Sequence, residues 1–125
     1  MYRLRVEDEF SAAHFLASYP GKCEKLHGHN YRVRLFVSGS ELDNCGMLLD
    51  FSLLKKTLKE VLEPLDHSLL NDIEIFGNNP SAERIAEFVF KNAAEKLAGI
   101  HGVVINAVDV FENDRSMARY EKGNS

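Results

Sequence analysis

Alternation of apolar and polar side chains in the first third of the chain constrains the fold more than any other feature. In residues 2–6, and again in residues 31–37, apolar side chains occupy every second position and most of the others are charged. A period of two is typical of a strand with one buried face. Pro20 and Gly21 lie between the two segments and predict a loop. We therefore predict a long hairpin in the first half of the chain.

Two later segments have helical periodicity. Apolar side chains in residues 52–63 recur at spacings of three and four, and Asp50 or Ser52 is a suitable N-cap. A second apolar stripe follows Pro80, which suits the first helical position with Asn79 as the N-cap. Both segments are predicted to be amphipathic helices that each bury one face.

Two further strands are expected after the helices. Residues 103–111 are apolar on nearly both faces, which is typical of a strand covered on both sides by helices or by another subunit. Residues 117–120 form a short final strand, and residues 65–71 are expected to be a loop. The predicted class is α+β in the order ββααββ, with residues 1–125 as a single domain.

Composition excludes some classes of function. Of the 125 residues, 45% are hydrophobic and 27% are charged, which is typical of a soluble globular protein. The net charge of -4 comes from interspersed acids and bases, so we expect no nucleic-acid partner. No apolar run approaches the roughly 18 residues of a membrane span, and the first residues lack the apolar core of a signal peptide. We expect a cytoplasmic protein without a membrane partner.

Three histidines in the predicted hairpin form a candidate metal site. His27 and His29 are two residues apart, so a strand directs both imidazoles to one face, and Gly28 leaves room for close approach. His14 lies on the facing strand, after an acidic step at residues 8–9 where we expect a β-bulge. Each histidine alone is more typical of a surface strand or a buried structural position. Three on adjacent strands suit Zn²⁺ with a fourth position open.

Three other residues are candidates for proton transfer. A turn would bring the sulfur of Cys23 back towards His27, where a nearby cation lowers the pKa of a thiol. Cys23 could instead form a disulfide with Cys45, although two cysteines in a chain without an export signal are more often reduced. Asp66 beside His67 suits the fixing of a histidine tautomer, the alternative being a loop-capping pair.

Glu112 is a candidate for ligand recognition. It shares a strand face with Val108 and Val110, so its carboxylate lies at the rim of a buried surface and needs a partner, unless it is a solvated strand end. Together the candidates predict a catalytic zinc site. Zinc would polarise adjacent substrate oxygens and make a neighbouring C–H acidic, and the Cys23 thiolate would move that proton.

These residues together resemble the 6-pyruvoyl-tetrahydropterin synthase superfamily. The resemblance covers nearly the whole chain and rests on separated motifs in the family's order and spacing. The motifs are Phe10 to His14, Cys23 with His27-Gly28-His29, Gly46 to Phe51, Leu65-Asp66-His67, residues 79–83 and Glu112. The short gap between Cys23 and His27 is most similar to the bacterial and archaeal branch, 6-carboxy-tetrahydropterin synthase of queuosine biosynthesis.

The resemblance implies a fold, an assembly and a metal. The fold is a tunnelling fold, in which a four-stranded antiparallel sheet carries two helices on one face. Three subunits close a barrel, and two trimers stack into a homohexamer with active sites at subunit interfaces. The implied zinc ligands are His14, His27 and His29.

The resemblance also implies roles for other residues. Cys23 would be the general base, and Asp66 with His67 would reach the zinc site from a neighbouring subunit. Glu112 would anchor the pterin ring through its N–H groups. Ser81 stands where the family often has threonine, near the pterin.

The implied reaction converts 7,8-dihydroneopterin triphosphate to 6-carboxy-5,6,7,8-tetrahydropterin with loss of acetaldehyde and triphosphate. Alternatives are triphosphate elimination to the 6-pyruvoyl product, a zinc- and pterin-binding module without catalysis, and a zinc hydrolase, which lacks an evident carboxylate base. A family variant with Glu in place of the catalytic Cys makes 6-hydroxymethyl-dihydropterin; here Cys23 is intact and Glu24 adjoins it. Candidate phosphate contacts, each also typical of a solvated surface, are Lys22, Lys25 and Arg115.

Overall fold

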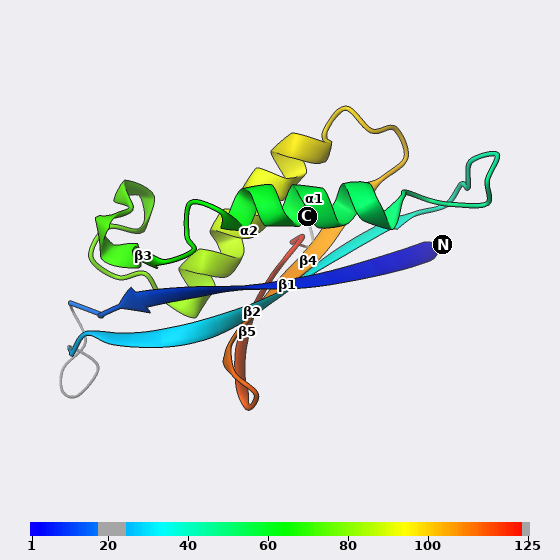
Figure 1. Cartoon of the computed structure of the whole chain (residues 1–125). Coiled ribbons are helices and arrows are strands. Elements are labelled where there is room, and N and C mark those ends of the chain that lie inside the picture. The colour runs from blue at the N-terminus through cyan, green and yellow to red at the C-terminus, as the bar shows by residue number, and fades with distance from the viewer. Residues whose placement is uncertain (18–24, 124–125) are drawn as a thin grey trace.

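A computed structural model describes residues 1–17 and 25–123 of the chain. Its strands form one sheet in the order β3-β1-β2-β4-β5, with two helices on one face of the sheet (Figure 1). The strands are β1 (Tyr2–His14), β2 (His27–Gly39), β3 (Ser68–Leu69), β4 (Val104–Asn113) and β5 (Ser116–Glu121). The helices are α1 (Phe51–Leu62) and α2 (Ala82–Leu97), with short 3₁₀ turns at Leu70–Asp72 and Glu74–Phe76.

The sheet is five-stranded and mixed, so the prediction of four antiparallel strands is wrong in part. The four long strands pair antiparallel, but β3 pairs parallel with β1 through Ala12 and Ala13. Residues 65–71 were expected to be a loop, because two strand residues are too few for a period to be visible. The chain is drawn against the edge of β1 by a bond from the His67 N–H to the Ser11 carbonyl, 2.6 Å.

The hairpin of β1 and β2 has an unbroken register from the Tyr2–Gly39 pair to the His14–His27 pair. The β-bulge predicted at residues 8–9 is therefore wrong, and the buried side chains of β1 stay on even positions throughout. Register irregularities lie instead between β2 and β4, at Phe36/Val37, and between β4 and β5, at Phe111/Asn113. The predicted loop at Pro20-Gly21 falls outside the described residues.

The N-cap of α1 agrees with the prediction from sequence, and the N-cap of α2 does not. Asp50 caps α1 as expected, with its Oδ1 accepting from the Ser52 N–H at 2.8 Å. Helix α2 starts two residues later than predicted, because the Ser81 hydroxyl, not Asn79, accepts from the Arg84 N–H at 3.2 Å. This leaves the peptide of Pro80 outside the helix, where its carbonyl is free to face the sheet.

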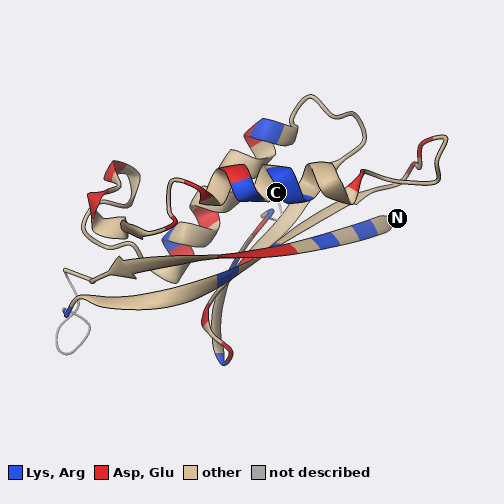
Figure 2. Ribbon diagram, viewed as in Figure 1, with Lys and Arg blue, Asp and Glu red and all other residues tan. Residues whose placement is uncertain are grey.

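The core lies between the sheet and the helices. Helix α1 packs over β1, and α2 packs over β4 and β5. Charges of both signs are distributed over the strands and helices (Figure 2). Among the described residues, neither helix combines the length and apolar character needed to cross a membrane. The fully buried aromatic and aliphatic side chains of this core include Tyr31, Phe10, Leu35, Leu54, Leu58 and Ile85.

Strand β4 is buried on both faces, as its sequence predicted, but helices cover only one of them. Val108 and Val110 pack in the core below the helices. On the opposite face Asp109 is buried by Arg119, whose guanidinium donates to both carboxylate oxygens at 2.6 and 3.0 Å. Side chains of the sheet itself therefore cover the second face, and further cover by another subunit stays a prediction.

Candidate active site

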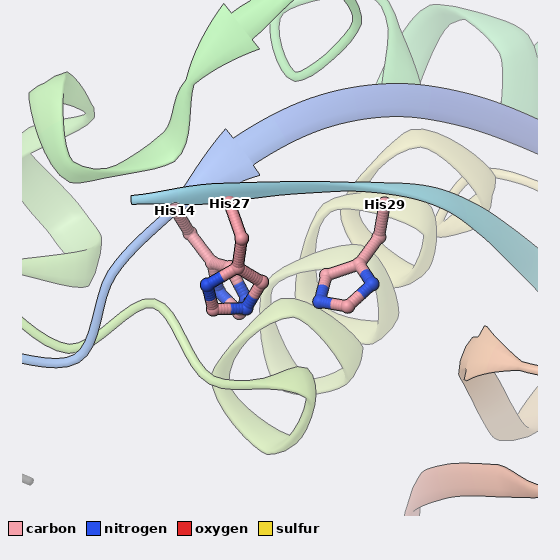
Figure 3. Close-up of side chains that lie close together, drawn as sticks. All are labelled: His14, His27 and His29. Atoms are coloured by element: carbon pink, nitrogen blue, oxygen red, sulfur yellow. The ribbon is translucent and has the colours of Figure 1, made fainter. Parts of the chain in front are cut away.

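The structure brings the three histidines of the hairpin together. His14 and His27 are paired at the end of the hairpin, and His29 lies opposite Ala12. Because alternate residues of a strand share a face, all three imidazoles project to the helix side of the sheet (Figure 3). One nitrogen from each ring can be chosen so that all three lie within 4.8 Å of one another. The group needs no residue from any other element.

Backbone carbonyls fix the tautomers of two of these rings. The Nδ1 of His14 lies 2.9 Å from the carbonyl of Pro80, and the Nδ1 of His27 lies 2.8 Å from the carbonyl of Lys25. A carbonyl can only accept, so each Nδ1 carries the proton and each Nε2 keeps a lone pair. The two Nε2 atoms are 2.9 Å apart. Two facing lone pairs at this distance favour a cation between them, and carbonyl-oriented histidines are typical of metal ligands.

His29 supplies a third nitrogen that lacks a partner. Its Nε2 is buried and has no hydrogen bond within the described part of the chain. Burial lowers the pKa of His29, and the neighbouring His14 and His27 act in the same direction, while the carboxylate of Glu112 opposes them. A neutral imidazole with a free, buried nitrogen is suited to bind a metal. The donor set therefore fits Zn²⁺ with a position left for another ligand.

Asp66 and His67 lie apart from this group, at the edge of β1. The Oδ1 of Asp66 accepts from the Ser11 N–H at 2.9 Å, and its Oδ2 lies 3.0 Å from the Nδ1 of His67. The Ser11 N–H, followed by His67, holds the pKa of Asp66 below its usual value. His67 has a left-handed backbone, φ 56°, and its side chain is 82% exposed. The pair is thus preformed but presented to solvent.

Glu112 lies on the same sheet face as the histidines. The last paired residues of β2 and β4 are Arg32 and Phe111, and continuing this register would place Tyr31 and Glu112 opposite each other on the helix side. The Glu112 carboxylate forms no hydrogen bond or ion pair with any described residue. Glu112 lines a cavity of about 400 Å³ together with Ala82, Glu83, Ser116, Met117, Ala118 and Arg119.

The other candidate residues are not part of the three-histidine group. Ser81 is the N-cap of α2 and precedes the cavity-lining Ala82 and Glu83. Lys25 contributes its carbonyl to His27, and Arg115 is exposed in the turn between β4 and β5. Cys45 is exposed in a turn. Three candidates lie outside the described residues: Lys22, Cys23 and Glu24.

Gly28 does not have the spatial constraint that the sequence led us to expect. A Cβ built at this position would meet only the Ala12 carbonyl oxygen, at the ordinary contact distance of 3.6 Å. The absence of a side chain at Gly28 is therefore not required by packing within one chain.

Two residues that the sequence did not single out support the site. Asn71 bonds to both the N–H and the carbonyl of Phe15, at 3.0 and 2.9 Å, and also donates to the carbonyl of Asn78 at 3.2 Å. It thereby ties the end of β1 to the segment that carries Pro80. Tyr31 continues the face of His27 and His29, a signal that the alternation contained. Asn71 gave no such signal, because its partner is 56 residues away in sequence.

Comparison with known proteins identifies relatives of this chain. Residues 3–123 match the family model described as 6-pyruvoyl tetrahydropterin synthase. A Synechocystis relative named 6-carboxy-5,6,7,8-tetrahydropterin synthase is 38% identical over 96% of this chain and 93% of its own. A Haemophilus influenzae relative of the same name is 30% identical over 98% of this chain and 100% of its own.

Solved structures show the same architecture. The 6-pyruvoyl tetrahydropterin synthase of Caenorhabditis elegans superposes with a TM-score of 0.85 at 28% identity, covering 98% of this chain and 96% of its own. That of Plasmodium vivax gives a TM-score of 0.80 at 25% identity, covering 98% of each chain. Fold and sequence together define a protein of the pterin-synthase class. The chain belongs to the 6-pyruvoyl tetrahydropterin synthase family, as its motifs predicted.

Proposed function

We propose that the chain is a zinc-dependent lyase that converts 7,8-dihydroneopterin triphosphate to 6-carboxy-5,6,7,8-tetrahydropterin, with loss of acetaldehyde and triphosphate. Its place would be in queuosine and 7-deazapurine biosynthesis, in the cytoplasm. The names of the relatives from Synechocystis and Haemophilus influenzae support this product. The observation that carries the proposal is that the three-histidine group and the free carboxylate of Glu112 lie on one face of the sheet.

His14, His27 and His29 would hold the zinc. When bound, zinc would supply Lewis-acid polarisation of the side-chain oxygens of the substrate. The Pro80 and Lys25 carbonyls keep the rings of His14 and His27 oriented, so the lone pairs need no rearrangement to bind. Burial keeps His29 neutral and ready to coordinate.

Glu112 would anchor the pterin ring. A carboxylate can accept two parallel N–H bonds, such as those offered by the amino group and the ring N–H of a pterin, and charge-assisted bonds of this kind are strong. The cavity of about 400 Å³ that Glu112 lines has room for such a ring. Ser81 would place the start of α2 beside it.

Cys23 would remove or return the proton at the carbon made acidic, and Asp66 with His67 would act as the complementary acid or relay. The exposed position of Asp66 and His67 at the edge of β1 supports a role towards the zinc site of a neighbouring copy. We accordingly propose the closed barrel of three subunits and the homohexamer as the active form.

One alternative product has separate support. The structural relatives from Caenorhabditis elegans and Plasmodium vivax are named 6-pyruvoyl tetrahydropterin synthases, which favours the 6-pyruvoyl product by elimination of triphosphate alone. A zinc- and pterin-binding module without turnover is the alternative outside the enzymes.

Incubation of the zinc-loaded protein with 7,8-dihydroneopterin triphosphate, followed by mass spectrometry, tests the proposal. We expect 6-carboxy-tetrahydropterin and acetaldehyde in equal amounts. Cys23→Ala should abolish both, while the matched Cys45→Ala should leave them unchanged, because Cys45 is exposed in a turn. A 6-pyruvoyl or 6-hydroxymethyl product would replace the proposed reaction, and binding without any product would establish the module.

A further inference from the structure

Tyr31 is the one tyrosine packed directly against the three-histidine group within the described chain. Its side chain is completely buried, and its ring stacks on that of Phe10 with centroids 4.8 Å apart and an angle of 14°. The rings of His29 and His14 meet it edge-on, at 5.3 and 5.9 Å. The position of the tyrosine ring is therefore set by packing on several sides.

The hydroxyl of Tyr31 is not explained by that packing. It is buried and has no hydrogen-bond partner among the described residues. Leaving a buried polar group unpaired is destabilising, and most such groups in proteins are paired. Phenylalanine would make the same ring contacts without this cost. The hydroxyl is therefore expected to form a hydrogen bond in the ligand-bound protein.

Glu112 is the acceptor that the sheet places nearest in register. Continuing the register one position beyond the Arg32–Phe111 pair would place Tyr31 opposite Glu112. Side chains at facing positions of antiparallel strands have Cβ atoms roughly 4.5–5.5 Å apart, which is within reach of a phenol and a carboxylate. Neither group has a hydrogen-bond partner among the described residues, and the phenol O–H of Tyr31 can donate to a carboxylate oxygen of Glu112.

We propose that Tyr31 is a positioning residue whose hydroxyl donates a hydrogen bond to the Glu112 carboxylate when that carboxylate turns to hold the pterin ring. The inference rests on the proposed role of Glu112. A carboxylate has about four lone-pair sites, so two N–H bonds to a pterin leave room for a third donor. The bond fixes the side chain of Glu112 in the rotamer that presents both oxygens to the ligand, and it satisfies the buried hydroxyl.

The test is pterin binding by zinc-loaded Tyr31→Phe, with Tyr2→Phe as the matched control on an exposed tyrosine. Neopterin, whose fluorescence reports binding, is the probe. A bond to a charged group is worth roughly 1.5–3 kcal/mol, so we expect the dissociation constant to rise about 10-fold or more. Zinc content should stay that of the wild type, and urea unfolding should show no loss of stability, because the unpaired hydroxyl has been removed. Unchanged affinity, or a loss of stability with unchanged affinity, would overturn the inference.

Two further measurements separate the causes of failure. In the Glu112→Gln background, Tyr31→Phe should change neopterin affinity by less than it does in the wild type; an equal change means that the hydroxyl acts on something else. Wild-type protein with ¹³Cζ-labelled tyrosine should show a shifted Tyr31 signal on neopterin addition, and the Glu112→Gln protein should not. If the wild type does not bind neopterin at all, the inference falls, whereas the proposed function is judged separately by turnover of 7,8-dihydroneopterin triphosphate.

Discussion

The three-histidine group and the Asp66–His67 pair differ in how far one chain completes them. His14 is buried and His27 and His29 are half-buried, two of the tautomers are fixed, and one buried nitrogen has no hydrogen-bond partner among the described residues. Asp66 is already bonded to Ser11 and His67, and the imidazole of His67 is 82% exposed. The histidine group is assembled from one hairpin, whereas the Asp66–His67 pair is hydrogen-bonded and open to solvent.

The three-histidine group and the Asp66–His67 pair therefore depend on different features of the structure. Metal ligands can come from neighbouring strands of one sheet, because the strand register alone brings their side chains together. An exposed acid–base pair at a sheet edge is available to whatever packs against that edge. The proposed sharing of the site between copies of the chain can therefore be tested one region at a time.

Removal of one histidine should have the largest effect. His27→Ala takes away a ligand whose orientation Lys25 fixes, so zinc affinity should fall by more than the roughly 10- to 100-fold typical of losing only a supporting bond. Zinc per chain after dialysis, measured by elemental analysis, should drop towards zero. The stabilisation that zinc gives in urea unfolding, about 2.7 kcal/mol at 100 times its dissociation constant, should disappear with it. His101→Ala, at an exposed turn, is the control; a His27→Ala protein that keeps its zinc contradicts the assigned site.

The second prediction concerns the other region. Asp66→Asn should keep its zinc but lose turnover by about 100-fold, since a positioned acid or base contributes 10²–10⁴. Co-refolding Asp66→Asn with His27→Ala in equal amounts should then restore activity to roughly a quarter of the wild type, because random assembly in a symmetric oligomer pairs intact halves at that frequency. No recovery in the mixture would mean that each chain uses its own pair.

A smaller effect is expected when the Asn71 hydrogen bonds that join β1 to the segment of Pro80 are removed. Asn71→Ala removes the bonds to Phe15 and Asn78, which should cost about 1–3 kcal/mol in urea unfolding. Because the Pro80 carbonyl is then less firmly held against His14, zinc affinity should also weaken by about 10-fold in a chelator competition. Asn44→Ala, in an exposed turn, controls for the loss of an amide. Reduced stability with unchanged zinc affinity would limit Asn71 to a structural role.

The smallest effect is in the pH dependence of the zinc-free protein, where the two regions should respond separately. Burial lowers the pKa of His29, so below its usual value of 6.5 the unfolded chain binds a proton that the folded chain does not. The free energy of unfolding should therefore fall as the pH drops through 6.5, and less so in His29→Gln. The pKa of Asp66 is lowered by hydrogen bonds, so its contribution is present above 3.8 and is lost as the pH falls further. Urea unfolding from pH 7 to pH 3 would check both, and identical curves for wild type and His29→Gln would contradict the first.

Much of the fold was predictable because it depends on local periodicity. The alternation in β1 and β2, and the apolar stripes of α1 and α2, gave the elements and the helix-facing side. One error came from a long-range hydrogen bond, and another came from a local choice between two possible N-caps. Strand β3 exists because His67 reaches the Ser11 carbonyl, and α2 begins at Ala82 because Ser81 takes the cap.

The candidate site divides in the same way. The positions of the three histidines and Glu112 follow from strand alternation once the register of the β1–β2 and β2–β4 strand pairs is known. The sequence does not predict the hydrogen bonds made by the carbonyls of Pro80 and Lys25 and by the amide of Asn71. Any residue has a carbonyl, and each of these hydrogen bonds depends on where the backbone passes.

The sequence by itself determined which side chains share a face, because a strand turns alternate residues to opposite sides whatever surrounds it. It also carried enough motifs to place the chain in its family. Tertiary structure alone decided that the buried Nε2 of His29 has no hydrogen bond to any described residue and that Asp66 lies at the exposed edge of β1. Burial and hydrogen bonding at these positions depend on contacts between segments far apart in the chain, and no local pattern encodes them.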